Sequence, residues 1–123
     1  MKEYSVPKNR FRNFYHFESA GSTMTEAENF IKKGVRGGIV LADMQSDGYG
    51  RNSKSWFSPD NGNIYMSFFE KMDQSKPLDL IPQRTALSVL ETVRHFVKDV
   101  PVNLKWPNDV LVDMKKVSGI IAK

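Results

Sequence analysis

The chain has 123 residues, a formal net charge of +4 and no cysteine. This length allows one domain with one hydrophobic core, and the lack of cysteine excludes disulfide frameworks, zinc–thiolate sites and cysteine nucleophiles. No apolar run is long enough to span a bilayer, and the first residues contain no signal-peptide segment. We therefore expect a cytoplasmic protein that does not enter the membrane.

The basic residues are spread along the chain, and pairs such as Lys32-Lys33 and Lys115-Lys116 are their densest groupings. No basic helical stripe or known nucleic-acid motif accompanies the positive charge, which favours a mildly basic surface over a nucleic-acid interface. The two histidines, His16 and His95, lie far apart in sequence, so a histidine metal site is not expected.

The first predicted elements are two strands. Residues before Arg10 read as a lead-in, and the aromatic-rich segment Phe11–Phe17 predicts a strand that ends at Glu18–Gly21. The apolar run Gly38–Ala42 predicts a second, buried strand.

A helix is predicted between these strands. Either Ser22 or Thr23 can cap its start, and Glu26 follows Thr23 by the spacing of a capping box. Gly34 is placed to end the helix.

The rest of the chain predicts one long helix and several strands. A turn at 58–62 leads to a strand at 63–70, with Ile64, Met66 and Phe68 on one face, and then to a polar loop at 71–76. A helix follows at 78–98, with Pro82 in its first turn. After it come a strand at 100–105, a turn at 107–109, and strands at 110–112 and 117–122 that are joined by residues 113–116. Because strands outnumber helices and often follow one another directly, we expect an α+β domain with a mixed or antiparallel sheet and helices packed on one face.

The loop after the second strand, residues 45–56, combines flexible, cationic and aromatic residues. It contains Gly48, Gly50, Arg51, Lys54 and Trp56. The glycines allow positive φ and a close backbone approach to a ligand, and the cations can face an anion. The loop therefore suits a small phosphate-bearing ligand, although an ordinary polar connection would use similar residues.

Two later stretches favour the ligand-binding interpretation of this loop over an ordinary connection. They are Lys105-Trp106-Pro107-Asn108-Asp109 and Lys116-Val117-Ser118-Gly119. Each alone is most often core, turn or solvated hairpin. Together with Ser22-Thr23-Met24 and the loop, in this order, they resemble the biotin protein ligases, also called biotin-[acetyl-CoA-carboxylase] ligases. That family has Ser-Thr-Asn or Ser-Thr-Met before a helix, then Gln-Thr-x-Gly-Arg-Gly-Arg-x-Gly-Arg-x-Trp, Lys-Trp-Pro-Asn-Asp and Lys-x-x-Gly-Ile.

The resemblance implies a two-step reaction. The biotin carboxylate attacks the α-phosphate of ATP, which gives biotinyl-5′-AMP and pyrophosphate, and Mg²⁺ accompanies the ATP. A lysine of a biotin carboxyl carrier protein domain, from acetyl-CoA carboxylase or a related biotin-dependent enzyme, then attacks the adenylate. The site must hold two anions together and exclude water.

The resemblance also assigns roles to residues. It implies that Arg51 and Lys116 are catalytic and act electrostatically. It implies no metal-binding cluster, although Asp109 would help to orient magnesium. It implies substrate binding by Ser22, Thr23, Met24, Gln45, Gly48, Tyr49, Arg51, Trp56, Lys105, Asn108, Asp109, Lys116 and Gly119. Of these, Ser22, Thr23 and Gln45 match residues at the biotin head group, Trp56 matches one near the adenine, and Lys105, Asn108 and Asp109 match the nucleotide side.

The chain departs from the family pattern in the loop and in length. Tyr49 replaces the first arginine, Ser53 the third glycine and Lys54 the last arginine. The resemblance implies a fold like that of class II aminoacyl-tRNA synthetases, with residues 1–123 as the N-terminal portion of the catalytic domain. The family domain continues past residue 123, so we expect either a shortened chain or a naturally reduced protein.

Further expectations concern partners. The Ser-Thr motif comes too early to leave room for an N-terminal helix-turn-helix, so DNA binding is not expected, and an open sheet edge could pair with a second copy in a homodimer. The alternatives are a lipoyl or octanoyl transferase, whose domain resembles the ligase fold but lacks Lys-Trp-Pro-Asn-Asp, and a non-catalytic module that holds biotin or binds nucleic acid weakly.

Overall fold

The computed structural model describes residues 1–5, 13–72, 75 and 78–123. The chain forms two compact units, Met1–Asp73 and Gln74–Lys123. The single core expected from the length is replaced by two hydrophobic clusters, one in each unit. The predicted polar loop at 71–76 falls at this boundary and lies partly outside the described residues. The α+β class is confirmed, with one helix packed on one sheet in each unit.

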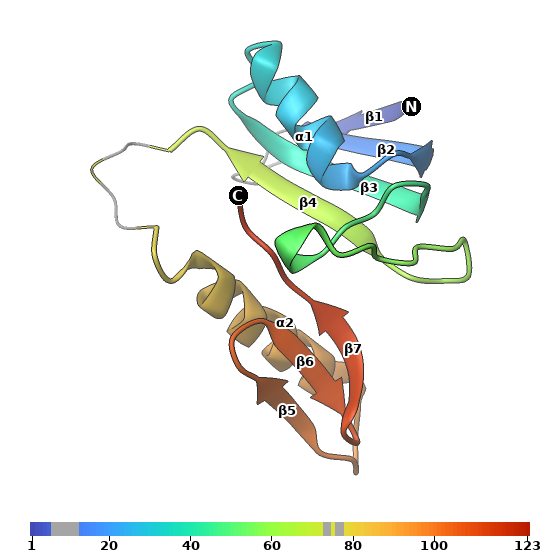
Figure 1. Cartoon of the computed structure of the whole chain (residues 1–123), viewed down its shortest axis with the longest axis vertical. Helices are drawn as coiled ribbons and strands as arrows, with labels where there is room; N and C mark the ends of the chain where they lie inside the picture. Colours follow the sequence, from blue (N-terminus) through green and yellow to red (C-terminus); the bar gives the residue numbers. More distant parts are fainter. Residues whose placement is uncertain (6–12, 73–74, 76–77) are drawn as a thin grey trace. The chain divides into compact units, whose positions relative to one another are not determined.

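The first unit contains a four-stranded mixed sheet in the order β1-β2-β3-β4 (Figure 1). Its strands are β1 (Lys2–Ser5), β2 (Asn13–Ala20), β3 (Gly37–Gln45) and β4 (Tyr65–Glu70). β2 and β3 run parallel, and the other two pairs are antiparallel. A parallel pair needs a long crossover connection, which helix α1 (Thr23–Lys32) provides.

Two boundaries in this unit differ from expectation. The predicted lead-in before Arg10 contains strand β1, which pairs with β2, while residues 6–12 lie outside the described part. Strand β2 continues to Ala20, past the predicted break at Glu18, because Ser19 and Ala20 pair with the extended end of β3. Long-range sheet pairing here overrides the local turn signal.

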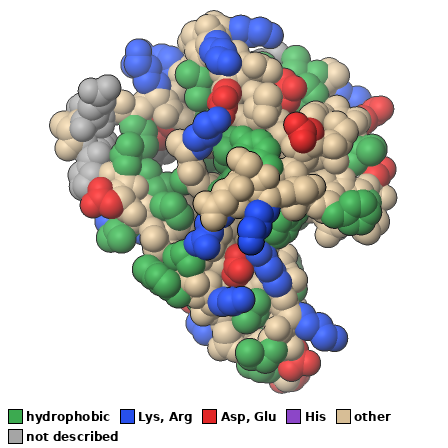
Figure 2. Space-filling model, in the orientation of Figure 1, with side chains coloured by type: hydrophobic (Ala, Val, Ile, Leu, Met, Phe, Trp, Pro, Cys, Tyr) green, Lys and Arg blue, Asp and Glu red, His purple; other side chains and the backbone are tan. Residues whose placement is uncertain are grey.

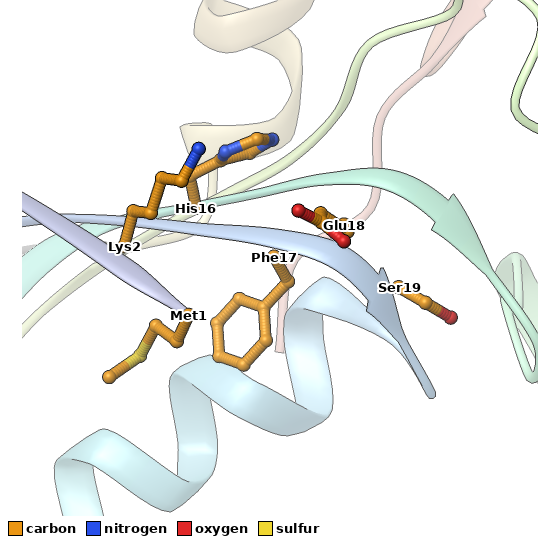
Figure 3. Close-up of a pocket in the computed structure, with 6 residues that line it drawn as sticks. All are labelled: Met1, Lys2, His16, Phe17, Glu18 and Ser19. Carbon is orange, nitrogen blue, oxygen red and sulfur yellow. The ribbon is translucent and has the colours of Figure 1, made fainter.

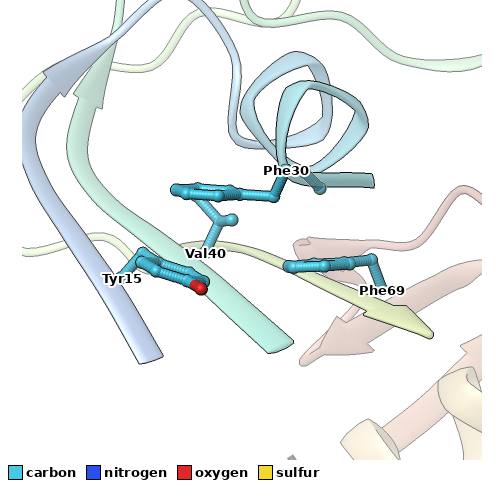
Figure 4. Packing of buried hydrophobic residues seen from close by; sticks show 5 residues of the cluster. Tyr15, Phe30, Val40 and Phe69 are labelled. Carbon is cyan, nitrogen blue, oxygen red and sulfur yellow. The ribbon is translucent and has the colours of Figure 1, made fainter. Parts of the chain in front are cut away.

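Helix α1 covers one face of this sheet through an aromatic cluster (Figure 4). The ring of Phe30 stacks on that of Tyr15 with 3.8 Å between centroids, and lies parallel to that of Phe69 at 6.1 Å. Val40 of the central strand is fully buried among them. Burying large side chains in this way is the main source of the unit's stability.

Strand β4 alternates between the two faces of the sheet. Tyr65, Ser67 and Phe69 are buried on the α1 side, whereas Met66 and Phe68 are 44% and 51% exposed on the other. Met66 and Phe68 share a face, as predicted, but this face is exposed. Ile64, predicted on the same face, precedes the strand.

The second unit packs helix α2 (Ile81–Phe96) on an antiparallel sheet, β5-β6-β7. Its strands are β5 (Val102–Lys105), β6 (Asp109–Val112) and β7 (Lys115–Gly119). Pro82 occupies the first turn of α2, as predicted, where its missing N–H costs no helical hydrogen bond. The buried residues Leu90, Val102 and Val110 form the core. Neither helix in the described part of the chain is long and apolar enough to cross a membrane.

The connection between β6 and β7 is shorter than predicted. Only Asp113 and Met114 form the turn, with φ of 47° and 63°, the left-handed pair of a tight hairpin. Lys115 and Lys116 therefore belong to β7 and not to a loop. Val117 falls between the pairs formed by its two neighbours and makes a β-bulge.

Candidate functional site

The predicted site residues divide between the two compact units. Met1–Asp73 contains Ser22, Thr23, Met24, Gln45, Gly48, Tyr49, Arg51 and Trp56, and Gln74–Lys123 contains Lys105, Asn108, Asp109, Lys116 and Gly119. Within the first unit, the start of α1, the end of β3 and the loop that follows are joined by hydrogen bonds.

Ser22 begins helix α1. Its backbone is extended, and its Oγ accepts a hydrogen bond from the N–H of Met24 at 3.3 Å. The Ser22 carbonyl accepts from the N–H of Glu26, so Glu26 lies four residues after the cap. The capping box expected between Thr23 and Glu26 therefore does not form, because Ser22 and not Thr23 occupies the capping position.

Thr23 is buried and links the helix to both neighbouring strands. Its backbone N–H donates to Oε1 of Gln45 at 2.8 Å, and its Oγ1 lies 2.9 Å from Oγ of Ser67 on β4. Met24 follows in the first turn and is half-buried. The helix start is thus fixed to the sheet by polar contacts in addition to its apolar face.

Gln45 connects that helix start to the loop. Its Nε2 donates to Oγ of Ser58 at 3.0 Å, and its backbone N–H donates to the Ser58 carbonyl at 3.0 Å. Sequence reasoning missed Ser58 and Ser67. Ser58 was assigned only to a turn, and no local pattern pairs a serine with a glutamine 13 residues earlier.

The glycine loop folds back on itself. The N–H of Trp56 donates to the Gly48 carbonyl at 2.8 Å, and the N–H of Gly50 donates to the Lys54 carbonyl at 2.7 Å. The 3₁₀ segment η1 (Arg51–Ser53) forms its tip. The loop is therefore a closed hairpin held by its own backbone.

Neither loop glycine uses the positive φ that its lack of a Cβ allows. The left-handed residues of the loop are Asn52 and Ser53, with φ of 56° and 54°, whereas Gly50 has φ of −108°. Gly48 is required for space instead. A Cβ there would lie 2.6 Å from Ser58 Oγ and 2.8 Å from both Gln45 Nε2 and the Trp56 carbonyl oxygen. The protein's own atoms exclude any larger residue.

The loop's cations remain at the surface. Arg51 and Lys54 are exposed, while Tyr49 and Trp56 are half-buried. On the face shown in Figure 2, Lys and Arg side chains lie among Asp, Glu and uncharged ones. The loop can therefore present an exposed guanidinium on a backbone held by its own hydrogen bonds.

In the second unit, the Lys105–Asp109 segment forms the end of β5, a turn and the start of β6. Trp106, which alone would more often be a core residue, is 70% exposed. Asn108 is buried, and its Nδ2 donates to the Ile120 carbonyl at 2.8 Å while its own carbonyl accepts from the Ile120 N–H at 2.9 Å. Asn108 thus anchors the segment after β7.

Lys116 lies on β7 with its Nζ 2.9 Å from Oδ1 of Asp109. It pairs with Leu111 across the ladder, on the same face as Asp109, whereas Lys115 pairs with Val112 and faces the other way. Gly119 pairs with Asp109 itself. The hairpin therefore holds the Lys116 ammonium next to a carboxylate.

The residues do not fit a preformed magnesium site. Asp109, the predicted magnesium-orienting residue, is paired with a cation. No group of three metal-ligating side chains occurs in the part of the chain that the structure describes. Magnesium usually keeps several waters and binds one or two free carboxylates together with substrate phosphates.

The first unit also contains a pocket formed by the start of the chain and strand β2 (Figure 3). It is lined by Met1, Lys2, His16, Phe17, Glu18 and Ser19. The Nε2 atom of His16 is 2.8 Å from Oδ1 of Asp43 on the neighbouring strand. None of the predicted site residues lines this pocket.

Comparison with known proteins gives consistent matches. The profile of the biotin/lipoate A/B protein ligase family matches residues 16–123. The bifunctional ligase/repressor BirA of Bacillus subtilis is 32% identical over 111 residues, which cover 89% of this chain and 34% of that protein. A biotin protein ligase from Aquifex aeolicus in complex with biotin and ATP aligns with a TM-score of 0.72 and 33% identity, over 90% of this chain and 46% of that chain.

A biotin protein ligase from Leishmania major in complex with biotinyl-5-AMP aligns with a TM-score of 0.61 and 26% identity. That alignment covers 93% of this chain and 51% of the other. The chain therefore spans between about a third and a half of the length of these relatives.

Proposed function

This chain belongs to the biotin/lipoate A/B protein ligase family, and we propose that it takes part in activating biotin with ATP to biotinyl-5′-AMP. The observation that carries the proposal is the match over 90% of the chain to a ligase whose structure holds biotin and ATP. Because the chain spans only part of its relatives, activity of this chain by itself is also part of the proposal.

We assign the biotin head group to the start of α1 and the end of β3. Ser22, Thr23 and Gln45 offer hydroxyl and amide groups there, and all three are held by hydrogen bonds to the protein. A ureido group needs both donors and acceptors in fixed directions, so a site with locked polar side chains binds it at low entropic cost. Met24 and Gly48 complete this side, Met24 by apolar contact and Gly48 through its backbone.

The two anions that must react, the biotin carboxylate and the α-phosphate, are proposed to be held by cationic side chains. Biotin carboxylate and the α-phosphate repel each other, and a positive group between them is most stabilising as the new bond forms. We assign this role to Lys116 and Arg51. Lys116 would exchange its ion pair with Asp109 for the two substrate anions, without forming a covalent bond to either.

The nucleotide side is proposed to involve Lys105, Asn108 and Asp109, with Trp56 near the adenine, Tyr49 beside the phosphates and Gly119 beside the biotin tail. The anchoring of the Ile120 backbone by Asn108 supports a rigid strand at Gly119. ATP carries its own Mg²⁺ in this proposal, since no group of three metal-ligating side chains occurs among the described residues.

The second step belongs to the proposal as well. A lysine amine of a biotin carboxyl carrier protein domain attacks the adenylate carbonyl, AMP leaves, and an amide forms. We also propose a cytoplasmic location and no DNA binding, although the Bacillus subtilis relative is a ligase/repressor. Strand β4 is an edge strand of the four-stranded sheet of the first unit, and pairing of a sheet edge with a second copy in a homodimer is a further proposal.

The test is pyrophosphate release by the chain with ATP, Mg²⁺ and either biotin, octanoate or lipoate. Of the three acids, only biotin is expected to give pyrophosphate release. Release with octanoate or lipoate in place of biotin would assign the chain to the lipoate branch of the family. Biotin binding without pyrophosphate release would identify a non-catalytic biotin-binding module and contradict the proposed activation.

A further inference from the structure

A continuous chain of hydrogen bonds runs from the start of α1 to the end of the glycine loop. The Thr23 N–H donates to Gln45 Oε1 at 2.8 Å, and Gln45 Nε2 donates to Ser58 Oγ at 3.0 Å. Ser58 Oγ then donates to the Trp56 carbonyl at 3.0 Å. Ser58 is 3% exposed, so water cannot readily replace either of its partners.

The backbone groups at the two ends fix the direction of this chain. The Thr23 N–H can only donate, and the Trp56 carbonyl can only accept. Oε1 of Gln45 must therefore face Thr23, and the single hydrogen of the Ser58 hydroxyl must go to Trp56. A lone pair of Ser58 Oγ is then left to accept from Gln45 Nε2. If the amide were flipped, its NH₂ group would face the Thr23 N–H, and two donors would meet without an acceptor.

Gly48 closes this arrangement. Ser58 Oγ, Gln45 Nε2 and the Trp56 carbonyl oxygen all lie within 2.8 Å of the position that a Cβ on Gly48 would occupy. No side chain can enter between these three polar atoms. The Gln45 amide is thus held on one side by the helix start and on the other by Ser58.

We propose that Ser58 is a positioning residue that fixes the Gln45 amide so that it offers an N–H donor to the bound ligand. Nε2 carries two hydrogens, and Ser58 accepts one of them. The ligand group that meets the second must be an acceptor, such as a carbonyl oxygen. The inference rests on the proposed function, because Gln45 acts on the ligand only if the biotin head group binds there.

A purely structural role is the competing explanation, since Ser58 also ties down the loop. The two roles differ in their dependence on Gln45. If Ser58 acts through Gln45, removing its hydroxyl has no further effect on ligand affinity once the Gln45 amide is gone. If Ser58 only supports the loop, the two losses add.

The experiment is a double-mutant cycle on the chain, with the dissociation constant of biotin as the readout. Ser58→Ala is expected to weaken biotin binding about tenfold, the effect of one misdirected hydrogen bond. Ser58→Ala combined with Gln45→Ala is expected to bind no more weakly than Gln45→Ala alone. Additive losses, or unchanged affinity in Ser58→Ala, would overturn the proposal.

Tyr65→Phe is the matched control. The Tyr65 hydroxyl donates to the Pro59 carbonyl at 3.0 Å, so it ties down the residue next to Ser58 without touching Gln45. This variant should bind biotin as the parent chain does. A loss equal to that of Ser58→Ala would show that loop support alone explains both.

A second readout separates this proposal from the proposed function. The side-chain amide resonances of Gln45 in ¹⁵N-labelled protein should shift in Ser58→Ala and stay in place in Tyr65→Phe, with no ligand present. If the parent chain binds octanoate or lipoate and not biotin, the proposed function fails, and the Gln45 resonances of the ligand-free variants alone decide whether Ser58 positions the amide. Unmoved Gln45 resonances in Ser58→Ala would overturn the positioning role whatever the ligand.

Discussion

In Met1–Asp73 the predicted site residues are joined by hydrogen bonds that include the buried Thr23, Ser58 and Ser67, whereas in Gln74–Lys123 the predicted catalytic lysine forms a partly exposed ion pair with Asp109. The side chains of Lys116 and Asp109 are 41% and 16% exposed. Ion pairs with such exposure contribute about 1 kcal/mol or less, while breaking a buried hydrogen bond costs about 1–3 kcal/mol.

This difference separates two kinds of preorganisation. The first unit fixes directions, as recognition of a neutral polar group requires. In the second unit, the role proposed for Lys116 requires its ammonium to leave a partly exposed ion pair with Asp109 and move onto the substrate anions. The following predictions test that division, beginning with the largest expected effect.

Lys116→Ala should lower the rate of pyrophosphate release about a hundredfold, which corresponds to about 3 kcal/mol of transition-state stabilisation. The physical reason is the loss of a positive charge between two anions that must meet. Circular dichroism should show an unchanged fold, because the ion pair it breaks is partly exposed.

Lys115→Ala is the matched control, because Lys115 pairs with Val112 and faces the opposite side of β7. It should keep nearly full activity. If Lys115→Ala loses pyrophosphate release and Lys116→Ala keeps it, the electrostatic role belongs to Lys115 on the other face of the strand. If both variants keep full activity, the electrostatic role of Lys116 is wrong.

Gly48→Ala should lower the free energy of unfolding of the first unit by about 2 kcal/mol, within the range for overpacked sites. Its Cβ would lie 2.6 Å from Ser58 Oγ, next to two further polar atoms that cannot move without losing hydrogen bonds. Denaturant unfolding measures the change.

Gly50→Ala is the control for this crowding. The nearest atoms to its Cβ would be 3.7 Å away, and its φ of −108° suits any residue. It should be neutral or slightly stabilising. Equal destabilisation by the two substitutions would contradict the idea that polar atoms pack against Gly48.

Arg51→Ala should weaken binding of biotinyl-5′-AMP about tenfold more than binding of free biotin, as expected for a charge-assisted contact to a phosphate. Arg51 lies at the exposed tip of the loop, away from the hydrogen-bonded base. Titration calorimetry with both ligands measures the two affinities. Equal losses would mean that Arg51 shapes the loop in general. They would contradict the proposed division between hydrogen-bonded groups that bind biotin and exposed cations that bind the phosphate.

Ser53→Gly should raise the free energy of unfolding by about 0.5–1 kcal/mol, the smallest of these effects. Ser53 has φ of 54°, a left-handed conformation that glycine adopts without strain, and the family pattern has glycine here. Lys54→Gly, at φ of −67°, has no such strain to relieve and should be neutral or destabilising. Denaturant unfolding of both variants checks the sign.

Local sequence patterns predicted both helices and most strands correctly because their signals lie within a few residues. Helix α1 follows from a polar cap, an apolar stripe and Gly34, whose φ of 86° ends it. Helix α2 follows from its apolar periodicity and Pro82 near its start. Boundaries were less well predicted where pairing decides them, as at Ala20 in β2 and Lys115 in β7.

The sequence alone determined the order of the motifs, and with it the family, because a motif is a property of neighbouring residues. It could not show that Ser22 and not Thr23 caps α1, or that Ser58 and Ser67 are partners of Gln45 and Thr23. Those partners are 13 and 44 residues apart. An isolated antiparallel bridge brings Ser58 to Gln45, and the packing of α1 on β4 brings Thr23 to Ser67. Only the tertiary structure decided them, because a hydrogen bond depends on positions about 3 Å apart in space and not on separation along the chain.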